Sequence, residues 1–422
     1  MLKLEHLVAF ARHHSPYYAQ LYRDVPTTGW QINDLPLVDP VQYWANNGGL
    51  HDWPALTGPI ADAHVFKTGG TTGSGKMSVY TREEWRTFVR TFGRGMSRQL
   101  NTGDRIANLF FAGDLYASFL FIHGSLAHMD TPVCEYPFTG AADPKTLTEQ
   151  ILSHHINVLV GVPAQLLRYA ADLASQDIQL PCVTALLYGG ESLFAEQLDL
   201  LHRVLPNARI ASIGCASVDA GLIGAATPDC QLGEHRCFEP ETIVEIIDEA
   251  SGEVIRETGR SGMLVITNLT RALMPLIRYP VGDLAAWVEP EGSSERKFVL
   301  LGRSSLGHRL RVGAASLFPD ELSELIQQLV GKCHWQLVID HRDGKDQVCL
   351  RIAHEGTAAQ AQQLIDTLEA KDPGLAQQMA DGQTVLAVEW CSQAALVLQA
   401  RTGKLQRVID RRDYRAQPGG AA

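Results

Sequence analysis

The sequence predicts an α/β protein, and three observations support this fold class. The chain has 422 residues, 45% of them hydrophobic, which is enough for more than one domain and a substantial core. Short apolar runs alternate with longer amphipathic stretches between residues 105 and 319, which is typical of a largely parallel sheet with helices between its strands. Within this region, short strands separated by turns from residue 242 to 301 indicate a β-rich subdomain. We therefore expect a large domain over residues 1–303 and a small α/β domain over residues 304–422.

The individual elements are expected in the following order. Residues 1–25 are predicted to be helical, with Leu4, Leu7 and Phe10 on one apolar face. Buried strands are expected at residues 106–110, 157–160, 185–187 and 209–213, and helices at residues 116–126, 144–154, 163–175 and 193–205. The β-rich part has strands at residues 242–247, 262–266 and 297–301. The C-terminal part has helices at residues 319–329 and 358–369 and strands at residues 335–339, 348–352 and 384–389.

Composition and charge exclude several classes of protein. The net charge is −11, which disfavours a non-specific nucleic-acid binder. No run of eighteen apolar residues is present, so we expect no membrane span, and the N-terminus does not have the pattern of a signal peptide. The eight cysteines are scattered, which suits reduced thiols, and we expect a cytoplasmic protein.

A loop rich in glycine and hydroxyl groups is the strongest functional signal. It consists of Thr68, Gly69, Gly70, Thr71, Thr72, Gly73, Ser74, Gly75 and Lys76. Glycines let backbone amides approach a polyphosphate, hydroxyls donate to its oxygens, and the lysine neutralises charge. A P-loop would require Ser or Thr at Met77 and a helix after the lysine, whereas residues 77–80 are apolar and β-branched and predict a return strand. A flexible surface turn is the other reading of this loop.

Four later segments combine turns with charged groups. They are Tyr188-Gly189-Gly190-Glu191, the acid loop Cys215–Gly221 with Asp219, the pair Gly282-Asp283 followed by Gly302-Arg303, and the basic stretch Arg401-Thr402-Gly403-Lys404. Taken one at a time, each segment also has a purely structural interpretation, as a strand-to-helix turn, a capping residue or a solvated basic tail. A carboxylate such as Asp283 offers two acceptor oxygens, which suits the two hydroxyls of a ribose.

Together and in this order, the segments resemble the adenylate-forming enzymes, which include acyl-CoA synthetases, aryl-CoA ligases and adenylation domains. The resemblance covers nearly the whole chain. The N-terminal His14-Ser15-Pro16-Tyr17-Tyr18 segment and the Leu-Pro segment at residues 35–38 are most similar to the phenylacetate-CoA ligase branch, to which acyl-protein synthetases are related. The chain departs from the family pattern where Asp219 replaces a Glu, where Cys215 replaces a Tyr, and where Ser304 replaces the Asp after the Gly-Arg pair. This last change puts the hinge residue in doubt.

The resemblance implies an enzyme that uses ATP and Mg²⁺ to activate a carboxylic acid, an aryl or a fatty acid, as acyl-AMP with release of pyrophosphate. A thiol of CoA, or of a phosphopantetheine arm, would then accept the acyl group after the small domain has rotated. The implied ATP- and AMP-binding residues are Thr68, Gly69, Gly70, Thr71, Thr72, Gly73, Gly189, Gly190, Glu191, Asp283 and Arg303. Lys404 would act on the α-phosphate, Lys76 would hold the β- and γ-phosphates, and Asp219 would position Mg²⁺.

The acyl group would occupy a pocket between the same segments. Its expected residues are Phe111, Tyr116, Tyr188, Ile213, Gly214, Cys215 and Ala216, although the two aromatic side chains at 111 and 116 equally suit a core. Cys230, His235 and Cys237 lie close together and, with Cys215, suggest a zinc site. Relatives with a structural zinc carry a further Cys pair that this chain lacks, which weighs against zinc here.

Three alternatives stay open at this point. The acceptor is CoA or an acyl carrier protein or protein thiol, and the sequence does not separate them. A non-catalytic nucleotide-binding protein is the alternative of another class, and Asp283 and Lys404 argue against it. The oligomeric state is also open, with a homodimer among the options.

Overall fold

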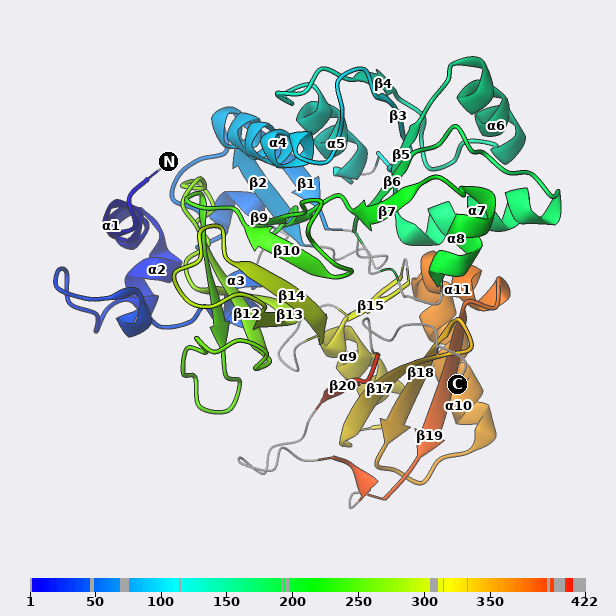
Figure 1. Cartoon of the computed structure of the whole chain (residues 1–422). Coiled ribbons are helices and arrows are strands. Elements are labelled where there is room, and N and C mark those ends of the chain that lie inside the picture. Colours follow the sequence, from blue (N-terminus) through cyan, green and yellow to red (C-terminus); the bar gives the residue numbers. More distant parts are fainter. Residues whose placement is uncertain are drawn as a thin grey trace.

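The computed structural model describes residues 2–45, 49–68, 76–113, 115–190, 193, 197–303, 310–313, 315–331, 333–392, 395–397 and 407–412. These residues form a five-stranded, a seven-stranded and a four-stranded sheet, with two small hairpins, and helices accompany them (Figure 1). This architecture confirms the predicted α/β class. Among the helices of the described residues, none combines the length and the apolar character that a membrane span needs.

The five-stranded sheet is parallel, with the order β4-β3-β5-β6-β7. Its strands are β3 (Arg105–Asn108), β4 (Cys134–Tyr136), β5 (Val158–Gly161), β6 (Ala185–Tyr188) and β7 (Arg209–Ser212), and the helices between them are α5 (Ser118–Leu126), α6 (Pro144–Ser153), α7 (Pro163–Ser175) and α8 (Leu198–Val204). Strands β5 and β6 are buried along their whole length, because helices cover a parallel sheet on both faces, and their sequences are therefore continuous apolar runs. The predicted elements of this region are confirmed, with small shifts at their ends, and β4 is an addition.

A two-stranded antiparallel hairpin precedes this sheet in the chain. Strand β1 (Ala63–Lys67) pairs with β2 (Met77–Thr81) in a register that places Lys67 opposite Met77. The predicted return strand is confirmed, and the arrangement differs from the strand–loop–helix of a P-loop. Helix α4 (Arg82–Ser97) follows β2 directly and begins with a capping box of Thr81 and Glu84.

The seven-stranded sheet is antiparallel, with the order β11-β12-β13-β14-β10-β9-β8. Its strands are β8 (Cys215–Ser217), β9 (Gly221–Ala225), β10 (Glu234–Cys237), β11 (Thr242–Ile247), β12 (Gly262–Asn268), β13 (Tyr279–Trp287) and β14 (Lys297–Arg303). The N-terminal helices share one buried core with this sheet, in which Leu7, Tyr18 and Tyr43 pack with Leu264 and Ile266. These helices are α1 (Leu4–His14), α2 (Pro16–Leu21), η1 (Ile32–Asp34), α3 (Pro40–Trp44) and η2 (Leu50–Asp52).

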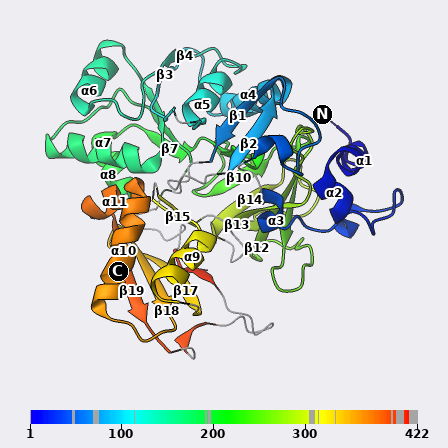
Figure 2. The same cartoon turned by 180° about the vertical axis from the view of Figure 1, so that it is seen from behind.

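The C-terminal unit begins with the β15–β16 hairpin and contains the four-stranded sheet β19-β18-β17-β20. Its elements are β15 (Leu310–Val312), β16 (Ala315–Leu317), α9 (Pro319–Leu329), β17 (Trp335–Arg342), β18 (Lys345–Ile352), α10 (Ala358–Lys371), α11 (Pro373–Ala380), β19 (Thr384–Trp390) and β20 (Val408–Asp410). Both views place this unit below the two larger sheets, with α11 beside α8 (Figure 1 and Figure 2). Among the described residues, one buried cluster consists entirely of residues from 310 onward. The division after residue 303 stays a prediction that this separate core supports.

Candidate active site

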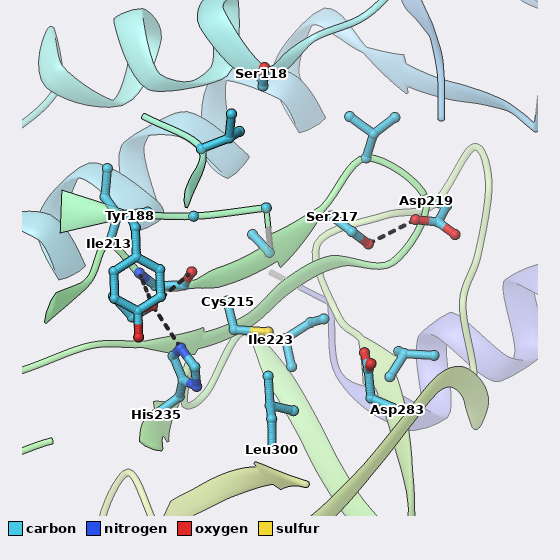
Figure 3. A pocket seen from close by; sticks show the side chains of 18 of the residues that line it. Ser118, Tyr188, Ile213, Cys215, Ser217, Asp219, Ile223, His235, Asp283 and Leu300 are labelled. Carbon is cyan, nitrogen blue, oxygen red and sulfur yellow. Dashed lines mark hydrogen bonds between the residues drawn. The ribbon is translucent and has the colours of Figure 1, made fainter. Parts of the chain in front are cut away.

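A cavity of about 280 Å³ lies at the carboxyl ends of β5, β6 and β7 (Figure 3). Residues of both large sheets, of the β1–β2 hairpin, of α4 and α5 and of the C-terminal unit line it. Ligands of open α/β sheets bind at the carboxyl ends of the strands, so the position is that of a ligand site. Asp219 and Asp283 lie at one side of the cavity in the close view, and Tyr188 and His235 lie at the other.

The ends of the predicted phosphate loop meet at this cavity. The backbone amide of Thr68 donates to the carbonyl of Lys76 over 2.9 Å, and the amide of Lys76 donates to Thr68 Oγ1 over 3.1 Å. Both residues line the cavity, and the Lys76 ammonium lies 5.1 Å from the ring centroid of Trp44. The predicted contacts of Gly69, Gly70, Thr71, Thr72 and Gly73 lie outside the described residues.

The Tyr-Gly-Gly segment forms the next part of the wall. Tyr188 ends β6, and Gly189 and Gly190 follow it into the cavity lining. A Cβ on Gly189 would come within 2.7 Å of the side chain of Ile213, and Gly190 has a positive φ of 85°. These two positions therefore require glycine. Glu191, the last residue of the predicted motif, lies outside the described residues.

The acid loop connects β8 and β9 and presents Asp219 to the cavity. Ser217 Oγ donates to Asp219 Oδ1 over 2.8 Å and accepts from the amide of Ala220 over 3.0 Å (Figure 3). This local network orients the carboxylate, and the hydrogen bonds of the described residues leave its second oxygen available. All four predicted acyl-pocket residues of this region line the cavity, namely Ile213, Gly214, Cys215 and Ala216.

The Gly-Asp pair lies on β13 opposite the Gly-Arg pair on β14. Asp283 faces Arg303 in the register of the two strands, and Leu284 faces Gly302. Asp283 and Gly302 both line the cavity. Arg303 belongs to β14, but the placement of its side chain lies outside what the structure describes.

The remaining walls of the cavity are largely aromatic. Of the aromatic residues expected in the acyl pocket, Tyr116 and Tyr188 line the cavity, whereas Phe111 does not; Phe111 is 37% exposed, and its ring lies against Gly140. Phe110, which opens the segment expected to contribute to the acyl pocket, also lines the cavity. The sequence analysis did not select several further apolar lining residues, and they are Phe88 and Phe92 of α4, Phe121 and Ile122 of α5, and Val162. The recurrence of Phe88 and Phe92 four residues apart behind the capping box was the available signal for this face.

His235 lies in the cavity wall and not in a metal cluster. Its Nε2 atom is 2.9 Å from Ser212 Oγ, and burial lowers the pKa of the imidazole to about 4. Cys230 Sγ instead contacts Thr227 Oγ1, and Cys237 is buried in the core beneath the N-terminal helices. Within the part of the chain that the structure describes, no three His, Cys, Asp or Glu side chains form a group that could hold a metal ion.

The C-terminal unit contributes three lining residues that the sequence analysis did not identify. They are Gly313, Asp346 and Arg412. Arg412 Nη1 donates to Asp346 Oδ2 over 3.1 Å, and Arg412 Nη2 donates to Asp410 Oδ2 over 2.6 Å. Lys404, the predicted catalytic lysine, lies outside the described residues.

Comparisons with curated proteins agree with the resemblance that the motifs indicate. The phenylacetate-coenzyme A ligase of Thermus thermophilus is 23% identical over 376 residues, which cover 83% of this chain and 79% of that protein. The phenylacetate-coenzyme A ligase of Aromatoleum evansii is 27% identical over 273 residues, which cover 63% of this chain and 59% of that protein. No family model matches the chain.

Solved structures agree with the fold. A 2-hydroxyisobutyryl-CoA ligase in complex with 2-HIB-AMP and CoA, in its thioesterification state, matches with a TM-score of 0.70 at 20% identity, over 97% of this chain and 88% of that chain. The same ligase in its postadenylation state matches with a TM-score of 0.61 at 20% identity, over 96% of this chain and 88% of that chain. These comparisons confirm the predicted resemblance to the adenylate-forming superfamily and to its phenylacetate-CoA ligase branch.

Proposed function

We propose, from the similarity of this chain to phenylacetate-CoA ligases, that it joins a carboxylic acid to CoA through an acyl-AMP intermediate. In the first step a carboxylate oxygen attacks the α-phosphorus of ATP, and the bond from that phosphorus to the β-bridging oxygen breaks, so that pyrophosphate leaves. In the second step the thiol sulfur attacks the acyl carbon, the thiol proton is lost to solvent, and AMP leaves.

The observation that carries this proposal is the convergence of the predicted groups on one cavity. Thr68, Lys76, Asp219 and Asp283 come from segments that are more than 200 residues apart at their extremes, and all four line the same space. Such chemistry depends mainly on positioning and on neutralising charge, so a cavity that gathers a lysine and two carboxylates beside glycine-rich turns suits it.

Each group has a proposed role. Thr68 and Lys76 would hold the β- and γ-phosphates, and Asp283 would accept hydrogen bonds from the ribose hydroxyls. Asp219 would hold Mg²⁺. This role fits because, among the described residues, the recorded hydrogen bond of the carboxylate uses only its Oδ1 atom, and because Mg²⁺ needs only one or two carboxylates besides phosphate oxygens. Arg303 would contact the nucleotide, and Lys404 would neutralise charge that develops on the α-phosphate.

An aryl acid is the proposed substrate. The wall formed by Phe88, Phe92, Phe110 and Phe121 gives this part of the cavity flat apolar faces, which favour the ring of an aryl acid by edge and offset contacts. The proposal does not extend to a particular acid. CoA is the proposed acceptor, and a carrier protein is the alternative that the following assay separates.

The experiment measures pyrophosphate release from Mg-ATP with a panel of aryl and fatty acids, with and without CoA. We expect release that depends on the acid, AMP and acyl-CoA as products, and a loss of about 100-fold or more in Lys404→Ala. Lys145→Ala is the matched control, because Lys145 is exposed on α6 and does not line the cavity. Release of pyrophosphate without consumption of CoA would favour a protein thiol as acceptor, and ATP binding without release for any acid would favour the non-catalytic alternative.

A further inference from the structure

Arg271 is a buried cation that the proposed mechanism does not use. It lies in the connection between β12 and β13, and its side chain is only 1% exposed. Glu84 of α4 holds this connection in place, because Glu84 Oε1 accepts from the amides of Ala272 and Leu273 over 2.6 and 2.9 Å. The backbone that directly follows Arg271 is therefore fixed to α4.

The guanidinium bridges two active-site segments. Arg271 Nη2 donates to the carbonyl of Val79 over 2.9 Å, and Arg271 Nη1 donates to the carbonyl of Asp219 over 2.9 Å. Its central carbon lies 3.9 Å from the ring centroid of Tyr80, which adds a cation–π contact. Its partners among the described residues are carbonyls, a hydroxyl, a thioether and a ring, and no carboxylate pairs with it. A lysine could not reproduce this fork, because only a guanidinium presents several donors in one rigid plane.

Two further side chains of β2 fix the same loop. Ser78 Oγ and Tyr80 Oη both donate to the carbonyl of Val218, over 2.7 and 2.8 Å. Strand β2 begins one residue after Lys76, and Val218 directly precedes Asp219. The distance between the exit of the phosphate loop and the Asp219 carboxylate is thus set by Ser78, Tyr80 and Arg271.

We propose that Arg271 is a positioning residue that holds Asp219 in place against the phosphate loop and so builds the site for the metal–nucleotide complex. The inference rests on the proposed roles of Lys76 and Asp219. Asp219 would hold Mg²⁺ together with the nucleotide, and this ion tolerates little change in the positions of its ligands, because Mg²⁺ requires near-ideal octahedral geometry. The substitution of Arg271 should therefore weaken binding of the nucleotide in the presence of Mg²⁺ much more than in its absence.

The test uses the full chain and a non-hydrolysable ATP analogue with a methylene group between the α- and β-phosphorus atoms. Calorimetry measures the dissociation constant with excess Mg²⁺ and again with EDTA. In Arg271→Met we expect the value with Mg²⁺ to rise about tenfold and the value with EDTA to change by less than about twofold. With Mg²⁺, the dissociation constant of Arg271→Lys should lie between those of the wild type and Arg271→Met, because lysine keeps the positive charge but loses the forked arrangement of donors.

Arg296→Met is the matched control. Like Arg271, Arg296 is buried, donates to two carbonyls, those of Glu289 and Arg256, and lies close to an aromatic ring, 4.1 Å from the ring centroid of Trp287. Unlike Arg271, it donates no hydrogen bond to the acid loop or to β2. It should lose thermal stability and keep both dissociation constants. If Arg271→Met does not fold, Tyr80→Phe provides the second variant, with an expected rise of about threefold with Mg²⁺ only.

The proposal would be overturned if Arg271→Met bound the ATP analogue equally more weakly with Mg²⁺ and with EDTA. It would also be overturned if this variant had a lower melting temperature but unchanged dissociation constants. The measurement needs no acid substrate. A chain that activates none of the acids in the panel therefore contradicts the proposed function, while the metal-dependent binding of the analogue still decides the role of Arg271.

Discussion

His235 shows how one side chain couples the cavity wall to the stability of the protein. Its ring is 4% exposed, packs 5.8 Å from the ring centroid of Phe298 and contacts Ser212 Oγ through Nε2. Burial disfavours the charged imidazolium and lowers the pKa of the side chain to about 4. The imidazole is therefore neutral at neutral pH, and it serves as a hydrogen-bonding partner and not as a cation for phosphate.

The depressed pKa predicts a specific loss of stability in acid. In the unfolded chain the pKa of a histidine is about 6.5, so below this pH the unfolded state binds a proton that the folded state excludes. The contribution of the neutral His235 to the free energy of unfolding is fully present above pH 6.5 and is lost as the pH decreases towards 4. The loss is about 2 kcal/mol between pH 7 and pH 5. Urea unfolding measures the free energy of unfolding at pH 7 and at pH 5. Between these two values the free energy should fall by about 2 kcal/mol less in His235→Gln than in the wild type.

A surface histidine provides the control for this measurement. His202 is exposed in α8, and His202→Gln should keep the pH dependence of the wild type. If His235→Gln and the wild type lost the same amount of stability between pH 7 and pH 5, the imidazole would not be excluded from protonation in the folded state.

At the scale of elements, the packing of α4 against α5 forms the aromatic wall. Gly93 is the point of closest approach, because a Cβ at this position would lie 2.3 Å from the carbonyl oxygen of Ser125. The neighbouring turns of these two helices carry Phe88, Phe92 and Phe121, which line the cavity. The small residue at position 93 therefore sets the spacing of the helices and, through it, the width of the proposed acyl pocket.

Gly93→Ala should separate the helices and disturb the acid site more than the nucleotide site. The clash is with backbone atoms, so relief requires movement of a helix, and we expect a loss of about 2 kcal/mol in the free energy of unfolding despite the better helix propensity of alanine. The KM for the acid should rise about fivefold and the KM for Mg-ATP should stay within about twofold, as measured by pyrophosphate release. Gly58→Ala is the control, since nothing lies within 4 Å of its added methyl group. A rise in both KM values together would contradict a role confined to the acid pocket.

The sequence predicted an element correctly where the interactions that stabilise it leave a pattern in neighbouring residues, and less well where they join residues far apart in the chain. Continuous apolar runs such as residues 158–161 and 185–188 predicted buried strands correctly, because burial on both faces leaves a local signature. Helix α4 was not predicted, although Thr81 and Glu84 carry the capping-box spacing that marks its start. The wall it builds was missed for the same reason.

Long-range contacts explain the remaining omissions in the candidate site. Arg271 contacts Val79 across 192 positions of sequence, and no local pattern indicates which carbonyls will receive its donors. Asp346 and Arg412 line the cavity only because the C-terminal unit is placed beside it. The glycine-rich and acidic motifs were recognisable because their chemistry is contained in a few consecutive residues. Phe111 was selected by the same local reasoning, although it does not line the cavity and its ring lies against Gly140.

At the scale of the whole molecule, the C-terminal unit contributes charged groups to the cavity. The present arrangement brings Arg412 and Asp346 to the cavity, and Arg412 donates hydrogen bonds both to Asp346 and to Asp410. We propose that this arrangement serves the transfer of the acyl group, whereas Lys404 serves its activation.

Substitution of Arg412 should therefore affect the second half-reaction selectively. In Arg412→Gln we expect the transfer of the acyl group from preformed acyl-AMP to CoA to slow about tenfold, while acid-dependent pyrophosphate release without CoA stays within about twofold. Lys404→Ala should show the opposite pattern, because its charge is needed only while the α-phosphate reacts. Arg351→Ala is the control within the same sheet, since Arg351 pairs with Glu389 and does not line the cavity, and it should leave both rates unchanged. If Arg412→Gln slowed both half-reactions equally, one fixed arrangement of the unit would serve both steps, and the proposed rotation near residue 303 would be wrong.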